Sequence, residues 1–170
     1  MIDQWHDFFL MVGSGAAALT GLVFVAMTLN LGEIVKETTH KHRAINTLTG
    51  FAAIVVICAL MLMGGQNYQT SGIEWLIASS IAACIYIYGV TKARMIGRSR
   101  FGLGLPRLVF GAALYIVEII GTILITLGYI TGLYVAAIAM VALLTFTITG
   151  AWLLLVGVEE ERQQSKKFAR

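Results

Sequence analysis

The chain has 170 residues, of which 58% are hydrophobic and only 12% are charged, and its formal net charge is +3. A soluble domain carries about 25% charged residues, so this composition excludes a water-soluble globular protein. The bilayer must be the solvent for most of the chain. The basic residues are spread over segments between apolar runs, a pattern that predicts no nucleic-acid partner.

Five apolar runs are long enough to cross a membrane, because about 20 helical residues span the hydrocarbon layer. Without water, the backbone of each run must be helical. We therefore predict an all-α polytopic membrane protein with five transmembrane helices in a single membrane domain, residues 1–170. The spans are residues 8–31, 44–63, 73–93, 106–130 and 132–158, and residues 159–170 form a cytoplasmic tail that extends the fifth helix.

The basic residues predict the orientation of these helices. All twelve fall in residues 36–43, 92–107 and 162–170, whereas the other two connections have none. By the positive-inside rule, these three segments are cytoplasmic, so the N-terminus is external and the C-terminus is cytoplasmic. Aromatic residues that suit the two interfaces agree: Trp5, Tyr68, Trp75, Tyr129 and Tyr134 on the external side, and Phe101, Trp152 and Phe168 on the internal side.

The third connection, KARMIGRSRFGLGLPR, is the most basic part of the chain. One interpretation is a loop whose cations only obey the topology rule. The other is a patch for anionic lipid headgroups at the cytoplasmic face, to which each cation contributes about 1 kcal/mol. Its candidate residues are Arg94, Arg98, Arg100 and Arg107.

Glu118 is the one ionisable residue deep inside a predicted span. On a helix of 100° per residue it shares a narrow face with Tyr115, Thr122 and Thr126, which lipid would not tolerate. In one interpretation Glu118 is protonated and hydrogen-bonded to a neighbouring helix. In the other it lines an ion or proton path. No span contains a Lys, Arg or His that could obviously neutralise it, which favours a protonated acid or a partner's charge.

Small residues recur at four-residue spacing in the first span, at Gly13, Ala17 and Gly21. Such a face lets another helix approach closely, within the chain or in another subunit. At the start of the second span, Arg43, Asn46, Thr47 and Gly50 share a face, which forms either a polar entry turn or a cytoplasmic vestibule.

Catalytic and metal-binding patterns are weak in this sequence. His40 and His42 alone do not make a metal site, and we expect no metal ion and no cofactor. Cys58 and Cys84 lie inside spans, where buried free thiols are the ordinary expectation. Nucleotide-binding and nucleophile motifs are missing from the sequence, so we expect no catalytic residues and no enzymatic activity.

The stretch WHDFF with GSGAAALTGLVFVA, within residues 5–26, and the later HRA resemble a group of small bacterial multi-pass membrane proteins. The resemblance covers about the first quarter of the chain. It implies a bacterial cytoplasmic (inner) membrane and no particular activity.

Two functions remain open from the sequence. The first is a small oligomeric membrane protein that forms or lines an ion or proton pathway, with Glu118 in mid-membrane. The second is a non-conducting accessory or assembly subunit of a larger membrane complex. In both, the partners are membrane lipids and either further copies of the chain or other subunits.

The predicted orientation can be tested by cysteine labelling in intact cells, with Cys58 and Cys84 replaced by Ala. A membrane-impermeant maleimide should modify Asn67→Cys and should reach Ser99→Cys only after permeabilisation, because only the first position is external. The reverse labelling pattern would overturn the orientation.

Overall fold

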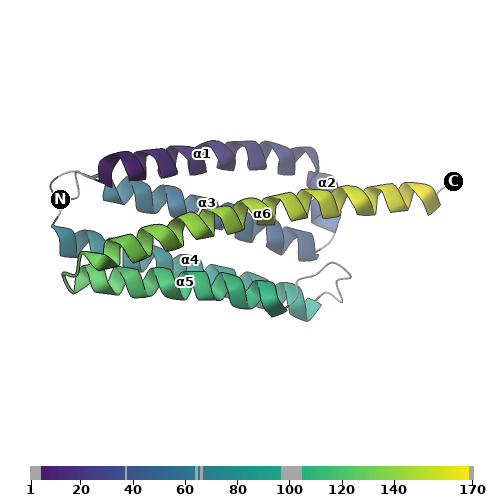
Figure 1. Cartoon of the computed structure of the whole chain (residues 1–170). Helices are drawn as coiled ribbons and strands as arrows, with labels where there is room; N and C mark the ends of the chain where they lie inside the picture. The colour runs from purple at the N-terminus through teal and green to yellow at the C-terminus, as the bar shows by residue number, and fades with distance from the viewer. Residues whose placement is uncertain (1–4, 37, 64, 66, 97–104, 169–170) are drawn as a thin grey trace.

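The computed structural model describes residues 5–36, 38–63, 65, 67–96 and 105–168. Six helices account for the regular structure in these ranges: α1 (His6–Leu29), α2 (Leu31–Lys36), α3 (Thr38–Met61), α4 (Tyr68–Ile96), α5 (Leu105–Thr126) and α6 (Thr131–Phe168) (Figure 1). Five of them are long and apolar enough to cross a membrane. The prediction of an all-α protein with five such helices is thus confirmed, and the six-residue α2 was not predicted.

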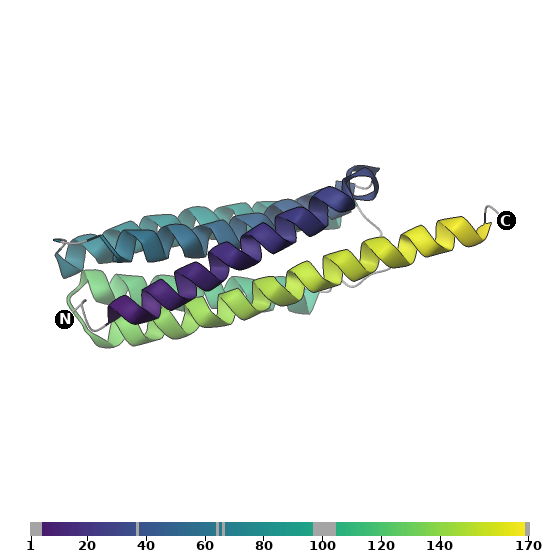
Figure 2. The same ribbon diagram turned by 90° about the horizontal axis from the view of Figure 1, so that it is seen from above.

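The long helices run along one bundle. The chain's N-terminus, the α3–α4 connection and the α5–α6 turn share one end, called the N-terminal end below, and the C-terminus projects from the other (Figures 1 and 2). Helix α1 packs mainly on α3, while α4 lies against both α3 and α5, and α6 packs on α5 and α3. Helix α1 also contributes to the core, because Phe9, Val12 and Ala16 are buried in one cluster with residues of α3, α4, α5 and α6.

A tight turn fixes the α5–α6 pair. The Tyr129 N–H donates to the Leu124 carbonyl at 2.9 Å and the Gly128 N–H donates to the Ile125 carbonyl at 2.9 Å, which is the Schellman pattern of a helix end. Gly128 has φ +90°, a conformation that favours glycine. Beyond the turn the helices touch at small residues: a Cβ at Gly121 would lie 2.6 Å from the Ala136 backbone nitrogen.

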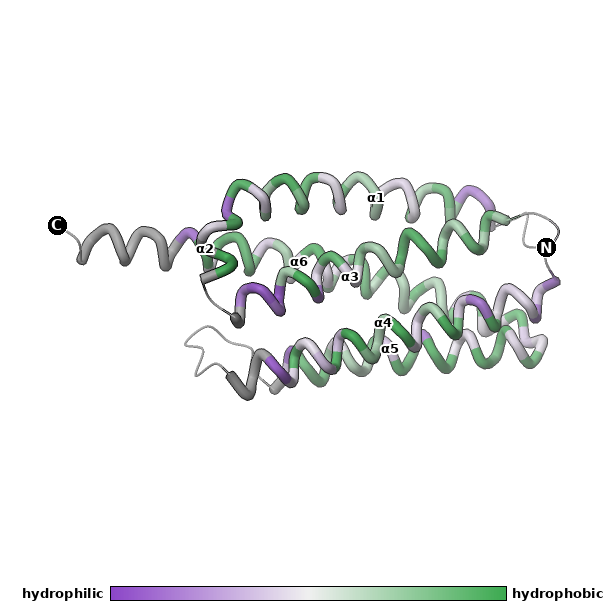
Figure 3. Tube along the Cα trace, turned by 180° about the vertical axis from the view of Figure 1, so that it is seen from behind, coloured by the Kyte–Doolittle hydropathy of each residue, from purple (hydrophilic) through white to green (hydrophobic). Residues whose placement is uncertain are grey.

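Apolar side chains cover the outside of the bundle. Polar residues collect towards its two ends, whereas the middle is hydrophobic (Figure 3). Large residues point outward, as Leu22 and Ile138 do with 69% and 70% of their surface exposed. Exposed apolar area of this extent marks contact with lipid or another protein, and with the five long helices it supports a multi-pass membrane protein.

The small face of α1 is divided between the interior and the outside. A Cβ at Gly13 would lie 2.8 Å from Cys58 Cβ of α3, so this glycine is needed for close packing. Ala17 and Gly21 face outward, and a Cβ at Gly21 would meet nothing within 4 Å. Close packing at these two positions stays a prediction, and it requires a partner from outside the chain.

Replacing Ala17 with Leu tests that prediction, with Gly13→Leu as the internal comparison. Ala17→Leu should leave the fold of a single chain intact and weaken self-association, because the new side chain adds bulk only to an outer surface. Gly13→Leu should destabilise the fold by about 1–3 kcal/mol through overpacking against α3. Native mass spectrometry and thermal unfolding in detergent measure the two effects. An unchanged oligomer in Ala17→Leu would show that this face contacts only lipid.

Candidate functional site

Glu118 lies on α5 and is 1% exposed, in the core of the bundle. It stands eight residues before the last residue of α5, about 12 Å along the helix axis. Glu118 therefore lies about 4 Å beyond the midpoint of α5, towards the N-terminal end of the bundle. A carboxyl group this deep needs hydrogen-bond partners from neighbouring helices.

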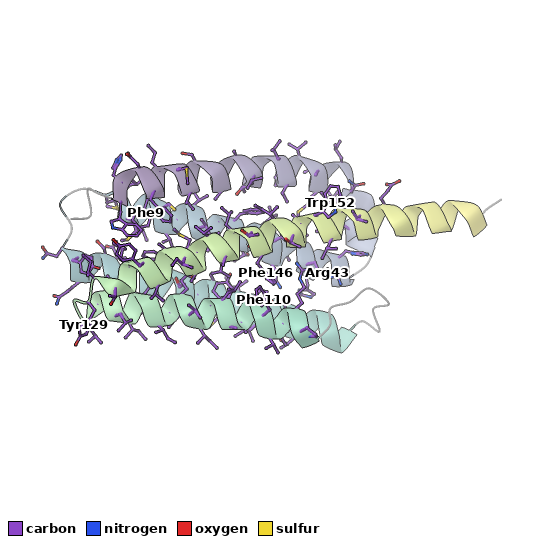
Figure 4. The ribbon with its side chains drawn as sticks, viewed as in Figure 1. Phe9, Arg43, Phe110, Tyr129, Phe146 and Trp152 are labelled. Carbon is purple, nitrogen blue, oxygen red and sulfur yellow. The ribbon has the colours of Figure 1, made fainter. Side chains whose placement is uncertain are left out.

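Trp75 of α4 supplies the main partner. Its indole N–H donates to Glu118 Oε1 at 3.0 Å, and the side chain is completely buried. The prediction that Trp75 lies at the membrane interface is wrong, because the ring is turned into the core instead. The Phe9 ring of α1 packs edge-to-face on it, with centroids 5.7 Å apart, from the N-terminal end of the bundle (Figure 4).

Ser79, one turn after Trp75, is the second polar group at the carboxyl. Its side chain is 0% exposed, and its hydroxyl interacts with Glu118. This contact falls outside ordinary hydrogen-bond geometry, and the Ser79 hydroxyl has no other hydrogen-bond partner in the described structure. We therefore treat it as a polar contact that a small movement would convert into a hydrogen bond.

Sulfur-containing side chains line the opposite side of the carboxyl. Cys58 of α3 is buried close enough to Glu118 to interact electrostatically, and its Sγ lies 4.0 Å from Met140 Sδ of α6. The expectation of a buried thiol holds for Cys58 but is wrong for Cys84, which is exposed.

The predicted polar face of α5 is turned towards protein. Tyr115 is 8% exposed and Thr122 is 0% exposed, while Thr126 is half-buried. Thr122 donates its hydroxyl hydrogen to the Ile119 carbonyl at 2.8 Å, and Thr126 donates to the Thr122 carbonyl at 2.9 Å. Both hydroxyls thus satisfy their donors on their own helix and keep oxygen lone pairs that can accept.

Polar groups continue from Glu118 towards the C-terminal end of the bundle. The Tyr115 ring lies 5.5 Å from that of Tyr86 on α4, and the Tyr86 hydroxyl donates to the Arg107 carbonyl at 3.1 Å. We call the set along the α4–α5 contact the polar seam. It consists of Trp75, Ser79, Tyr86, Tyr115, Glu118 and Thr122.

The α4 half of the polar seam was missed from the sequence. Trp75, Ser79 and Tyr86 recur at spacings of four and seven residues, which places them on one helical face. That periodicity was a usable signal. It was hidden because tryptophan and tyrosine near a span end are typical of interface anchors.

Charged partners of Glu118 do not occur in the part of the chain that the structure describes; the interactions there come from neutral Trp75 and Ser79. Within the same ranges, no three His, Cys, Asp or Glu side chains group together in a way that could hold a metal ion. The site can therefore bind, orient and exchange a proton, and it offers little to a metal cation.

The basic patch is only partly described. Arg98 and Arg100 lie outside the described residues, and for Arg94 only the backbone, in α4, is described. Arg107 is half-buried, with its guanidinium carbon 5.1 Å from the centroid of the Phe146 ring of α6. The patch thus remains a prediction except at Arg107, whose surroundings are defined.

The polar face at the start of α3 packs against other helices. A Cβ at Gly50 would lie 3.1 Å from the Thr147 side chain of α6, and one at Gly89 of α4 would meet the Asn46 amide group directly. Thr47 is buried and donates to the Arg43 carbonyl at 2.9 Å. This face is thus covered by α4 and α6 in the bundle.

Comparisons with protein-family models, curated proteins and solved structures give no match to this chain. The function is therefore argued from the geometry of the polar seam.

A double-mutant cycle tests the Trp75–Glu118 hydrogen bond. Trp75→Phe and Glu118→Leu should each lower the free energy of unfolding, and the double variant should lose at least about 1 kcal/mol less than their sum, because one bond is removed in both. Denaturant unfolding in detergent measures all three variants. Trp152→Phe, which alters an outward-facing ring of α6, should combine additively with Glu118→Leu. Additivity at Trp75 would contradict the bond.

Proposed function

We propose that this protein is a small oligomeric membrane protein that forms or lines a pathway for ions, with protons as the cargo and Glu118 as the group that carries them. In this proposal the N-terminus is external, the α6 end is cytoplasmic, and the membrane is a bacterial cytoplasmic membrane. The observation that carries the proposal is a fully buried carboxyl group whose described partners are all neutral.

Neutral partners suit a group that must both hold and release a proton. The Trp75 indole can only donate, and it does so to Oε1, where an ionised and a neutral carboxyl group both accept. The Ser79 hydroxyl can donate to a carboxylate or accept from a carboxylic acid. Both protonation states of Glu118 therefore find partners without a change of fold. A permanent cation beside the carboxyl would instead hold it in the charged form.

The polar seam supports a route as well as a carrier. Tyr115 and Tyr86 lead from Glu118 towards the proposed cytoplasmic side, and Thr122 and Thr126 lead towards the external side. Hydroxyl groups can accept and donate in turn, so they can pass a proton along with bridging water molecules. Thr122 and Thr126 donate their hydroxyl hydrogens to their own helix, so each can accept from a bridging water molecule and must rotate before it donates a proton onward.

A second candidate is the non-conducting accessory or assembly subunit. The outward-facing Ala17 and Gly21 on α1 favour it, because a small face without a partner in the chain suits a contact with another helix. In that case the hydrogen bond from Trp75 to Glu118 only stabilises the packing of α4 on α5, and Glu118 has no transport role.

Proton flux in reconstituted vesicles separates the two candidates. Glu118→Gln keeps the shape and the hydrogen bond from Trp75 but cannot titrate, so proton flux should fall at least about tenfold and lose its dependence on pH. Glu159→Gln makes the same chemical change at an exposed position on α6 and should leave the flux unaltered. Unchanged flux in Glu118→Gln, beside a clear wild-type signal, would remove Glu118 from the mechanism. Wild-type vesicles without flux under varied ions, pH and voltage would favour the accessory subunit.

A further inference from the structure

Arg107 is a charged side chain of the described bundle that the proposed function leaves unused. It is the third residue of α5, inside the apolar span of Pro106–Thr126, at the end opposite Glu118. Rather than being fully exposed, the side chain is half-buried. A guanidinium group at such a depth needs an anion or several acceptors, because it stays charged at every accessible pH.

The protein holds this guanidinium in place. The Phe146 ring of α6 lies 5.1 Å from its central carbon, a cation–π distance. A Cβ at Gly150 of α6 would lie 2.9 Å from Arg107 Nη2 and 3.8 Å from Thr47 Oγ1 of α3, so both groups lie next to this glycine. Three helices thus bring a guanidinium and a hydroxyl group to one place.

Arg107 stands near the start of α5, at the end of the bundle opposite the α5–α6 turn (Figure 1). Helices α5 and α6 lie side by side near the N-terminal end and diverge towards the other (Figure 1). Phe110 and Phe146 lie between them, and Arg43 of α3 lies nearer the C-terminal end (Figure 4). On α3, Arg43 precedes Thr47 by four residues, which is about one helical turn, so the same face carries a second basic residue.

Two described carboxylates, Glu118 and Glu159, stand well away from Arg107 along α5 and α6. Among the described residues Arg107 takes part in no ion pair. Glu118 is eleven residues away on the same helix, about 16 Å along the axis, and Glu159 follows Gly150 by about 14 Å of α6. An anion from outside the chain fits this position, because no described carboxylate pairs with Arg107.

We propose that Arg107 binds the phosphate group of one anionic phospholipid beside α5 and α6. A phosphate offers the planar pair of acceptor oxygens that a guanidinium fork matches, whereas the Thr47 hydroxyl donates to the Arg43 carbonyl and takes no part. Lipid is the source favoured by position, because the site lies at the end of an apolar span, where headgroups meet the hydrocarbon layer. The exposed Phe110, beside Phe146, lies against the adjoining acyl chain.

The test compares lipid binding by the intact protein in nanodiscs of phosphatidylcholine with and without phosphatidylglycerol of the same acyl chains. Phosphatidylglycerol should raise the unfolding temperature and remain bound in native mass spectrometry. Arg107→Gln should lose about five- to tenfold in phosphatidylglycerol retention. Lys92→Gln, which removes an exposed cation of α4 at the same end, should retain it.

Several results would overturn the proposal. Equal stabilisation by both lipids, or full retention of phosphatidylglycerol by Arg107→Gln, would show that Arg107 holds no headgroup. Inorganic phosphate that reproduces the effect in phosphatidylcholine nanodiscs would assign the site to a free anion instead. If Arg107→Gln fails to fold, Arg107→Lys decides: it keeps the charge but loses the fork, so retention should fall by a smaller factor, and unchanged retention would contradict the site.

Discussion

The hydrogen bond between Trp75 and Glu118 sets the arrangement of the core. A carboxyl group in a hydrocarbon environment is costly unless other groups satisfy it, and only a neighbouring helix can supply them. Trp75 donates to the carboxyl and Ser79 lies beside it on the same face of α4, which fixes both the rotation of α4 and its register along α5. Apolar packing alone gives less rotational specificity, because lipid tails and leucine side chains are equally apolar.

Close helix contacts make that bond possible. Gly121 lies against the Ala136 backbone, and Gly72 of α4 lies against Ile125 and Thr126, so α4, α5 and α6 converge towards the α5–α6 turn. Larger side chains at these glycines would separate the helices and draw the indole away from the carboxyl. The small residues near the N-terminal end therefore support the polar seam. They hold the helix backbones close enough for the Trp75 indole to reach the Glu118 carboxyl group.

Much of this architecture was predictable from the sequence, because hydrocarbon imposes simple rules. Five apolar runs had to be five helices, and the face of Glu118, Tyr115 and Thr122 had to avoid lipid. Contacts between helices could not be derived in the same way. Trp75 suits an interface as well as a core, and only the position of Glu118 towards the N-terminal end determines that the indole turns inward. Likewise, the face of Gly13 and Ala17 is continuous in sequence, yet the tilt of α1 across α3 buries only its first member.

The two charged residues of α5 are satisfied in different ways because of where they stand. Glu118 and Arg107 are about 16 Å apart along one helix, too far to pair. Glu118 lies beside the neutral side chains of Trp75 and Ser79, which are compatible with both of its protonation states. Arg107 instead lies over the Phe146 ring at the end of the span, where we propose that an external anion binds. Moving the guanidinium next to the carboxyl would satisfy both charges within the chain, but it would also fix Glu118 as a carboxylate. The separation therefore leaves the carboxyl able to titrate, which is the property that the proposed pathway requires.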